Sequence, residues 1–374
     1  MIILHLPSWF PRPEKPLDGN FILRQIATVA PHTTSIVVRH IDTEFREECA
    51  KMMDKDIVFR PIFTQKGTSK IQMLRAYDYE VAKIIRKYGK PDLIHLHVAL
   101  PLAPIALYLS YRYRIPIVVT EHWSVYQSQN RELLSWKQRL QLKMLFHRVQ
   151  HLTAVSDYLH TAIVETIRIA NKIPYTRISN VVDTQLFKPN LKTRGEKKRI
   201  LHISTLDDRA KNIMGILHSM ELLLNKRSDF ELNIIHDLDN SLVTNYIQER
   251  TLSNFVHLLG KKTEQEVAQY IQQCDFMLIY SNYETQSCVL LETFCCGRPA
   301  VATRVGGIPE IANELNAQLV EPRNDVKLAE ALDKMLDSTE KYDERAIRQQ
   351  AESVCSVQHV GEQFIEVYKR ALNQ

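Results

Sequence analysis

Residues 275–310 read DFMLIYSNYETQSCVLLETFCCGRPAVATRVGGIPE. The stretch opens on an apolar run of strand length, which a polar segment ends. A second apolar run, Cys288–Cys296, has the length of a short helix and stops at Gly297 and Pro299, two residue types that end helices. A third apolar run then meets Gly306-Gly307. The stretch therefore predicts a strand, a loop, a helix, a second strand and a turn.

This unit carries two carboxylates. Glu284 lies in the predicted loop and Glu292 lies inside the predicted helix. The start of a helix presents free backbone N–H groups and the positive end of a dipole, which suit a phosphate. A loop carboxylate beside a helix start can accept hydrogen bonds from sugar hydroxyls while the helix binds phosphates, as a nucleotide-sugar site requires. An ordinary strand-loop-helix unit with two surface glutamates remains the alternative.

The composition is that of a globular enzyme. A chain of 374 residues with 45% hydrophobic and 24% charged residues predicts two domains with a core each. No apolar run approaches the roughly 18 residues of a membrane span. The first residues, MIILHLPSWFPRP, resemble a strand and lack the features of a signal peptide. The six cysteines form no C-x-x-C pair, so we expect reduced thiols and a cytoplasmic location.

The charge is uneven along the chain. Residues 1–187 carry 25 Lys and Arg against 16 Asp and Glu, a net +9, and the remainder carries 23 against 27, a net −4. The basic first half favours an anionic partner there, with incidental surface charge as the alternative. The basic residues are not interleaved with aromatic residues in one patch, so we expect no nucleic-acid binding.

Strands and helices are expected to alternate along nearly the whole chain, the rhythm of a parallel α/β sheet. The charged segment KPNLKTRGEKK, residues 188–198, interrupts this rhythm and is interpreted as a linker. We therefore predict two doubly wound α/β domains with a cleft between them. The predicted boundaries are 1–187 for the first domain, 188–198 for the linker, 199–355 for the second domain and 356–374 for a C-terminal helix, whose packing back on the first domain is left open.

Several motifs, taken in this order and spacing, give the chain a resemblance to the retaining glycosyltransferases of family 4. The main motif is Glu284-x7-Glu292, followed by Gly297-x-Pro299 and Gly306-Gly307-x-x-Glu310. The supporting segments are DLIHLH at 92–97, IPIVVTEH at 115–122, TAVSDYL at 153–159 and SNVVD at 179–183. The resemblance implies the GT-B architecture, in which two Rossmann-like domains face each other across a cleft.

The resemblance also implies roles for individual residues of the second domain. Glu292 would accept hydrogen bonds from the ribose hydroxyls of the donor, and Glu284 would face the donor sugar. Lys211 would neutralise the leaving diphosphate. The remaining donor-binding positions are the backbone N–H groups of Gln286, Ser287, Cys288 and Val289, which would cap the sugar and the diphosphate.

Two residues of the first domain receive roles in the same way. His122, in the TEH segment, would reach the transferring sugar from the opposite side of the cleft. Gly19 would let the backbone approach the diphosphate closely because it has no Cβ. His122 has an alternative interpretation, in which it closes a strand end through hydrogen bonds together with Glu121 and Trp123.

The chain departs from the family pattern at two places in the donor site. Thr205 stands where the family usually has an arginine, and Arg209 is a candidate replacement for that phosphate contact. The segment 285–287 reads TQS where the family commonly has Gly-Phe-Gly, which indicates a changed donor preference or a reshaped loop.

The predicted reaction moves a hexose from a UDP- or GDP-sugar to an acceptor hydroxyl, with retention of configuration, in polysaccharide or glycolipid assembly. No metal or other cofactor is expected, since the Asp-x-Asp pair Asp237 and Asp239 is predicted to lie in a loop. A dehydrogenase is disfavoured because no G-x-G-x-x-G follows a strand. A sugar-nucleotide epimerase or hydrolase and a non-catalytic nucleotide-sugar-binding protein remain the alternatives.

Two further features stay open. His95 and His97 share one face of a strand, where two histidines suit a metal but no third ligand is evident, so hydrogen-bonded histidines are favoured. Residues Arg131–Gln150 carry five basic residues and one acid, with Leu133, Trp136, Leu140 and Met144 at helical spacing. This helix would either contact an anionic membrane, at its inner face and near a lipid-linked acceptor, or pack its apolar side on the core.

Overall fold

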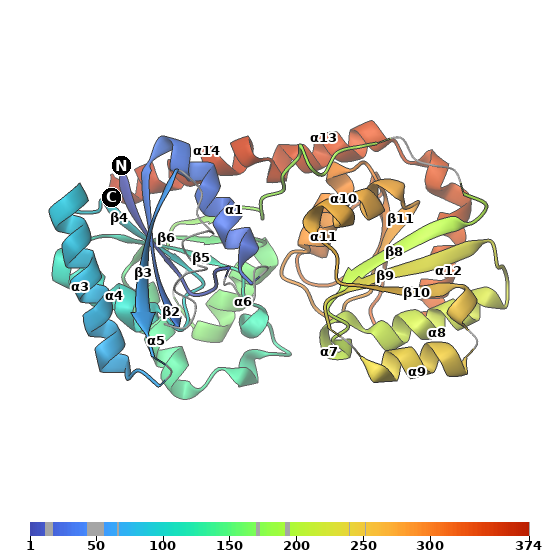
Figure 1. Ribbon diagram of the computed structural model, residues 1–374, viewed down its shortest axis with the longest axis horizontal. Coiled ribbons are helices and arrows are strands. Elements are labelled where there is room, and N and C mark those ends of the chain that lie inside the picture. Colours follow the sequence, from blue (N-terminus) through green and yellow to red (C-terminus); the bar gives the residue numbers. More distant parts are fainter. Residues whose placement is uncertain are drawn as a thin grey trace. The chain divides into compact units, whose positions relative to one another are not determined.

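The computed structural model describes residues 1–11, 18–42, 56–65, 67–169, 173–190, 195–238, 240–250 and 252–373. The chain forms two compact units, each with its own parallel sheet (Figure 1). Unit 1 consists of Met1–Val181 and Val357–Gln374, and unit 2 of Val182–Ser356.

Unit 1 is built on a seven-stranded sheet in which every pairing is parallel. The strands are β1 (Ile2–Pro7), β2 (Thr34–Asp42), β3 (Ile57–Thr64), β4 (Leu93–His97), β5 (Ile117–Glu121), β6 (Val149–Ala154) and β7 (Tyr175–Arg177), in the order β3-β2-β1-β4-β5-β6-β7. The helices are α1 (Asn20–Val29), α3 (Lys70–Tyr88), α4 (Ala103–Tyr113), α5 (Trp136–Phe146), α6 (Asp157–Ile167) and α14 (Val357–Leu372).

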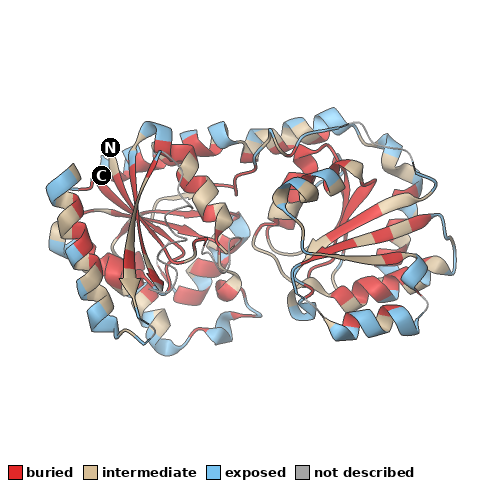
Figure 2. Ribbon diagram, in the orientation of Figure 1, coloured by how far each residue is buried: buried red, intermediate tan, exposed pale blue. Residues whose placement is uncertain are grey.

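Both faces of this sheet are covered, because successive side chains of a strand point to opposite faces. Leu4 and Leu6 of β1 belong to the core beneath α3, α4, α5 and α6. Ile3, on the other face, packs with α1 and α14. Strands buried on both sides therefore appear as continuous apolar runs in the sequence, and the strands of both units are largely buried (Figure 2).

Unit 2 repeats the plan with six parallel strands. They are β8 (Lys198–Ser204), β9 (Phe230–His236), β10 (Val256–Gly260), β11 (Phe276–Ile279), β12 (Ala300–Thr303) and β13 (Ala317–Val320), in the order β10-β9-β8-β11-β12-β13. The helices are α7 (Asp208–Lys211), α8 (Ile213–Leu224), α9 (Ser241–Glu249), α10 (Glu264–Gln273), α11 (Cys288–Cys295), α12 (Asp325–Ser338) and α13 (Glu344–Cys355). Helices α8, α9 and α12 cover one face, and α10, α11 and α13 cover the other. The predicted pair of doubly wound α/β domains is confirmed.

The boundaries of the units differ from the predicted ones. Unit 2 begins at Val182, and Phe187 is buried in its core. Of the predicted linker 188–198, residues 191–194 lie outside the described part of the structure. Its first residues belong to unit 2, because Arg298 donates a hydrogen bond to the carbonyl of Asn190 over 3.3 Å. The polar composition of the segment therefore marks a surface connection within unit 2.

The C-terminal helix α14 is part of unit 1. Its Gly361 lies against Thr28 of α1, where an added Cβ would be 2.9 Å from the Thr28 carbonyl oxygen. Phe364 and Tyr368 are buried with Ile3 of β1. The helix thus closes one face of the first sheet, more than 350 residues along the chain from β1.

Candidate active site

The carboxyl ends of β8 and β11, neighbouring strands of unit 2, carry an ion pair. Lys211, at the end of α7, donates to Glu284 Oε1 over 2.5 Å, and Ser281 Oγ donates to the same oxygen over 3.0 Å. Burial disfavours the charged form of Lys211, but attraction and a hydrogen bond from Glu284 outweigh it, so the pKa of Lys211 is raised. Ligands of open α/β sheets bind at this edge of the sheet.

The loop that carries Glu284 is held from two sides. Asn282 N donates to the carbonyl of Ala210 over 2.8 Å, which fixes the loop to α7. On the other side Gly306 has a φ of 54° and lies so close that an added Cβ would be 1.7 Å from the Glu284 carbonyl oxygen. A glycine is therefore required at position 306, because a side chain there would collide with the backbone of Glu284.

Helix α11 begins directly after this loop. Ser287 caps it by accepting a hydrogen bond from Leu290 N over 3.3 Å. The first backbone N–H groups of the helix, at Cys288 and Val289, are directed out of its N-terminus as in any helix. Gln286 and Ser287 are buried, and Ser287 stands at the second glycine of the Gly-Phe-Gly pattern of the family.

Glu292 lies in the second turn of α11 and is 8% exposed. The structure thus brings Lys211, Glu284 and the start of α11 together at one edge of the sheet of unit 2. Glu292 follows on the same helix as the predicted donor-binding N–H groups.

Thr205, which stands at the position of the arginine of the family, and Arg209, the candidate replacement for its phosphate contact, are both exposed. Thr205 follows β8 directly, and Arg209 lies in the short helix α7, whose cap is the Asp207 side chain. The Arg209 carbonyl accepts from the Asn282 side chain over 3.2 Å, which ties this turn to the Glu284 loop. Asp237 directly follows β9, while Asp239 lies outside the described residues.

In unit 1, His122 follows the carboxyl end of β5. It is 6% exposed, and its Nε2 donates to Gln25 Oε1 of α1 over 3.2 Å. The Phe21 ring lies 4.6 Å away. Burial lowers the pKa of His122 to about 3, against a smaller opposing effect of a hydrogen bond with Asn180, so the imidazole is neutral at pH 7.

Gly19 is the residue before α1 and has a φ of 69°. An added Cβ would lie 2.6 Å from the backbone of Trp9 and Phe10, so the glycine admits the chain itself at this point. Because Gln25 and Phe21 belong to the same helix, α1 connects Gly19 with His122.

A group of buried histidines lies at the same edge of the sheet of unit 1. His5 Nδ1 is 3.1 Å from His97 Nε2, and the rings of His95 and His97 are 3.8 Å apart. His5 is therefore a third candidate metal ligand, with ring nitrogens of all three histidines within 4.8 Å of one another, so the expectation that no third ligand is present was wrong. The nitrogens of His95 are within hydrogen-bonding distance of Thr120 Oγ1 (2.6 Å) and Tyr368 Oη (2.7 Å), so the favoured interpretation as hydrogen-bonded histidines fits this geometry.

Four contributors to these sites were missed: Ser281, Gln25, Asn180 and His5. Two signals were available in the sequence. Ser281 is three residues before Glu284, and Asn180 lies in the SNVVD segment. Gln25 and His5 had no comparable signal, because their role depends on helix and strand neighbours that are distant in sequence.

The two parallel-sheet α/β units, of seven and six strands, have the architecture of the GT-B fold. The model for "Glycosyltransferase Family 4" matches residues 23–186, and that for "Glycosyl transferases group 1" matches residues 183–353. The chain belongs to glycosyltransferase family 4 and is a transferase.

Relatives named as glycosyltransferases match this chain in sequence, and solved structures match it in fold. The MMP alpha-(1->4)-mannosyltransferase of Mycolicibacterium hassiacum is 31% identical over 51% of this chain and 47% of its own length. The putative teichuronic acid biosynthesis glycosyltransferase TuaC of Bacillus subtilis is 25% identical over 89% of this chain and 88% of its own. The fold of Anabaena HepE, solved in complex with UDP, matches with a TM-score of 0.79 at 20% identity, over 99% of this chain and 100% of that one. Within the described residues, no helix is both long and apolar enough to cross a membrane.

Proposed function

We propose that the chain transfers a hexose from a UDP- or GDP-sugar to a hydroxyl of a sugar, glycolipid or lipid-linked acceptor, with retention of configuration. The observation that carries this proposal is the Lys211–Glu284 pair beside the start of α11. Glu284 accepts from donor-sugar hydroxyls, and Lys211 with the helix N-terminus stabilises the charge of the departing diphosphate. The UDP complex of the HepE relative supports a nucleotide donor.

In this proposal the charge of the diphosphate is balanced by the protein, without a metal ion. A cationic side chain and a helix N-terminus supply the electrostatic stabilisation that a divalent ion supplies in other transferases. The expected result is an unchanged transfer rate in the presence of a chelator; a rate restored only by added Mg²⁺ or Mn²⁺ would contradict it.

The test of the proposed function is donor-dependent nucleotide release by Lys211→Met. Removal of the ammonium leaves the Glu284 carboxylate without its partner and the diphosphate without its cation. We expect at least about a 100-fold lower rate, the size found for loss of one stabilising group. Lys226→Met is the matched control, because Lys226 pairs with Asp333 on the surface of the same unit.

The acceptor dependence of that release separates the alternatives. A transferase releases nucleotide faster with an acceptor, and the sugar appears in the product. An epimerase or hydrolase would release nucleotide at the same rate without any acceptor. A binding protein would show a nucleotide-dependent rise in melting temperature with no turnover.

We also propose that unit 1 contacts an anionic membrane, at its inner face. The predicted helix 131–150 is in fact a 3₁₀ turn, η4 (Arg131–Leu133), followed by α5. Its four spaced apolar residues do not pack on the core, because they are between 51% and 70% exposed. We call them the α5 face; they are Leu133, Trp136, Leu140 and Met144.

Basic side chains surround the α5 face. Lys137 lies over the Trp136 ring, 5.5 Å from its centroid, and Lys143 is exposed on the same helix. Apolar side chains flanked by lysines are the pattern of a helix that lies in a membrane interface. This arrangement would bring the enzyme to a lipid-linked acceptor.

Flotation with vesicles tests the membrane contact. Trp136→Ser with Leu140→Ser should abolish co-flotation with vesicles that contain an anionic lipid. Leu242→Ser should not, although Leu242 of α9 is 73% exposed. Equal flotation of all three proteins would refute the membrane contact and leave the transferase assignment in place.

A further inference from the structure

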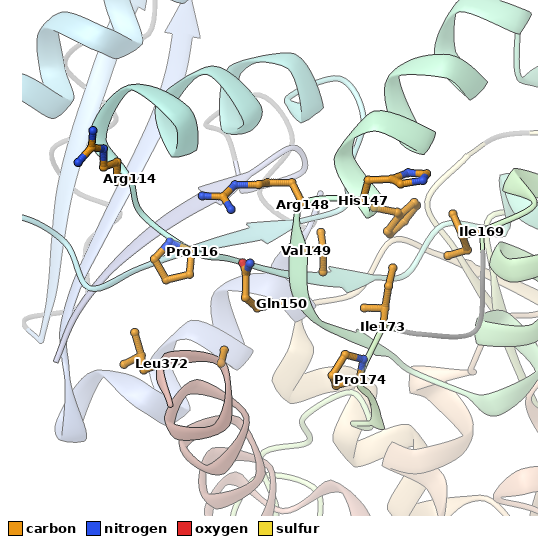
Figure 3. A pocket seen from close by; sticks show the side chains of 12 residues that line it. Arg114, Pro116, His147, Arg148, Val149, Gln150, Ile169, Ile173, Pro174 and Leu372 are labelled. Atoms are coloured by element: carbon orange, nitrogen blue, oxygen red, sulfur yellow. The ribbon is translucent and has the colours of Figure 1, made fainter. Parts of the chain in front are cut away.

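A pocket of about 730 Å³ opens at the edge of unit 1 opposite to His122 (Figure 3). Pro116, Val149 and Pro174 line it, at the amino ends of β5, β6 and β7. Leu372 at the end of α14 closes one side. The pocket thus lies away from the carboxyl edge of the sheet, where His122 follows β5.

The chemistry of its wall is cationic and apolar. Arg114, Arg148 and Gln150 supply polar groups, while Phe146 and Ile173 supply apolar surface. Among the described residues that line the pocket there is no aspartate and no glutamate. Guanidinium groups with no acid beside them bind phosphate oxygens well, through pairs of parallel hydrogen bonds.

Neither arginine is neutralised by a carboxylate within the described residues. Arg148 donates from Nε to Ser110 Oγ over 3.2 Å, and its guanidinium lies 5.2 Å from the Tyr111 ring centroid. These contacts orient Arg148 and leave its charge uncompensated. Arg114 is exposed at the end of α4 and forms no ion pair with any residue that the structure describes.

Gln150 adds a further donor. Its Oε1 accepts from Ile117 N over 2.9 Å, which leaves the side-chain NH₂ group available at the wall of the pocket. A volume in the range of small-molecule sites admits a glycerophosphate group.

The pocket begins where α5 ends, close in the chain to the α5 face. Met144 belongs to that face, and Phe146, His147 and Arg148, which line the pocket, lie within four residues of it. The residues that follow Met144 directly in the chain therefore lead from the exposed face of α5 to the wall of the pocket. An amphiphile could therefore place its charged group in the pocket while its apolar part lies against the α5 face.

We propose that this pocket binds the phosphate of an anionic phospholipid headgroup, with the α5 face in the same lipid surface. The proposal rests on the membrane contact proposed above and names its lipid partner. The site is separate from the donor site, so it anchors the enzyme and takes no part in sugar transfer.

The test compares Arg114→Gln with Arg86→Gln on vesicles of phosphatidylcholine, with and without phosphatidylglycerol. Arg86 is exposed on α3 and matches the charge change. Arg114→Gln should weaken binding to the anionic vesicles about fivefold, the usual contribution of one basic side chain near such a surface. Arg86→Gln should change it less than twofold, and Arg114→Glu should weaken it further.

Three outcomes would overturn the proposal. Equal weakening by Arg114→Gln and Arg86→Gln would indicate general attraction without a site. Protection or competition by inorganic phosphate alone, with no dependence on lipid, would assign the pocket to a free anion. The third outcome is that Arg114→Gln leaves vesicle binding unchanged while the Leu140→Ser and Met144→Ser double variant loses it. That result would support the membrane contact of the α5 face and refute lipid binding by the pocket.

A separate measurement distinguishes this proposal from the proposed function. Nucleotide release by Arg114→Gln with a soluble acceptor should equal that of the unmodified enzyme. An unchanged rate of nucleotide release by Lys211→Met would instead contradict the transferase assignment, independently of the vesicle-binding results.

Discussion

At the scale of single residues, the position of Glu284 depends on a glycine 22 residues later in the chain. Gly306 presents only a hydrogen where any other residue would place a Cβ inside the Glu284 carbonyl. Two parts of the family motif therefore depend on each other: the Glu284 carboxylate, and the turn at Gly306 that leaves room for the Glu284 backbone. The motif was recognisable in the sequence, but its reason is visible only in three dimensions.

Gly306→Ala should displace Glu284 and lower nucleotide release by at least about tenfold, because the added methyl group meets backbone that cannot rotate away. Gly260→Ala is the matched control: Gly260 has a φ of 66°, and an added Cβ there meets nothing within 4 Å. The control should lose about 1 kcal/mol of stability from its left-handed backbone alone. Equal activity of the two variants would contradict the proposed role of Gly306.

Glu121, beside His122, is a second residue with an unusual state. It is fully buried, and its Oε1 accepts from Ala99 N (2.9 Å) and Tyr126 Oη (2.7 Å). Burial raises the pKa of Glu121 to about 7, although these hydrogen bonds oppose the rise. The native protein therefore holds a proton that the unfolded chain releases above about pH 4.5.

From that difference, the free energy of unfolding should fall as pH rises from about 4.5 to about 7, by at most about 3 kcal/mol from this group. Glu121→Gln cannot titrate and should lack this dependence. Urea unfolding of both proteins between pH 5 and pH 8 measures it, with the exposed Glu132→Gln as control. Parallel stability curves for the wild type and Glu121→Gln would refute the raised pKa.

At the scale of elements, most strands were predictable because central strands such as β1, β4 and β5 are buried on both faces and appear as short apolar runs. The helix predicted over residues 131–150 was too long: α5 ends at Phe146, and β6 already begins at Val149. The apolar residues of the α5 face extended the helical pattern, although they face solvent. Sequence periodicity reports which residues are apolar, and it does not report which side of a helix meets the core.

The site residues were likewise predictable where a sequence motif names them, and unpredictable where their contacts depend on the fold. Glu284, Glu292 and Lys211 could be named from the family motif and its spacing. The partnership of Lys211 with Glu284 could not, because it depends on β8 and β11 being neighbours. The third histidine, His5, was missed for the same reason, since β1 and β4 are adjacent only in the sheet.

Helix α14 offers a test at this scale. Gly361→Ala should destabilise unit 1 by about 1–3 kcal/mol, because the new methyl group would press on the Thr28 carbonyl. In an isolated helix the same change would stabilise by up to about 1 kcal/mol, so the sign identifies the packing effect. Urea unfolding followed by tryptophan fluorescence measures it, with Glu362→Ala on the exposed side as control. A stabilised Gly361→Ala protein would show that α14 does not press on α1.

At the scale of the whole molecule, buried histidines determine the response to acid. Burial lowers the pKa of His5 and His122 to about 3, and that of His151 and His202 to about 4. The unfolded chain binds protons at these positions below about pH 6.5, while the native protein does not. The free energy of unfolding should therefore fall as pH decreases from about 6.5 toward 4.

Because three of these four histidines belong to unit 1, unit 1 should lose stability first. All three tryptophans, Trp9, Trp123 and Trp136, lie in that unit, so their fluorescence reports it alone. The buried thiols of unit 2 report the other unit through a thiol reagent; they are Cys274, Cys295, Cys296 and Cys355. At pH 5 the fluorescence change should come at lower urea than thiol labelling. The reverse order would contradict the assignment.

Helix α14 also bears on how the protein is made. During synthesis, residues 1–181 emerge from the ribosome long before residues 357–372, and all of unit 2 emerges in between. Until then Ile3, Val29, Leu93 and Val118 have no cover from α14. All residues of unit 2 are contiguous, so unit 2 can complete its fold during synthesis. Unit 1 can complete its fold only when α14 has been made, and until then one face of its sheet stays exposed. Nascent chains stalled before residue 357 are thus the ones that need a chaperone.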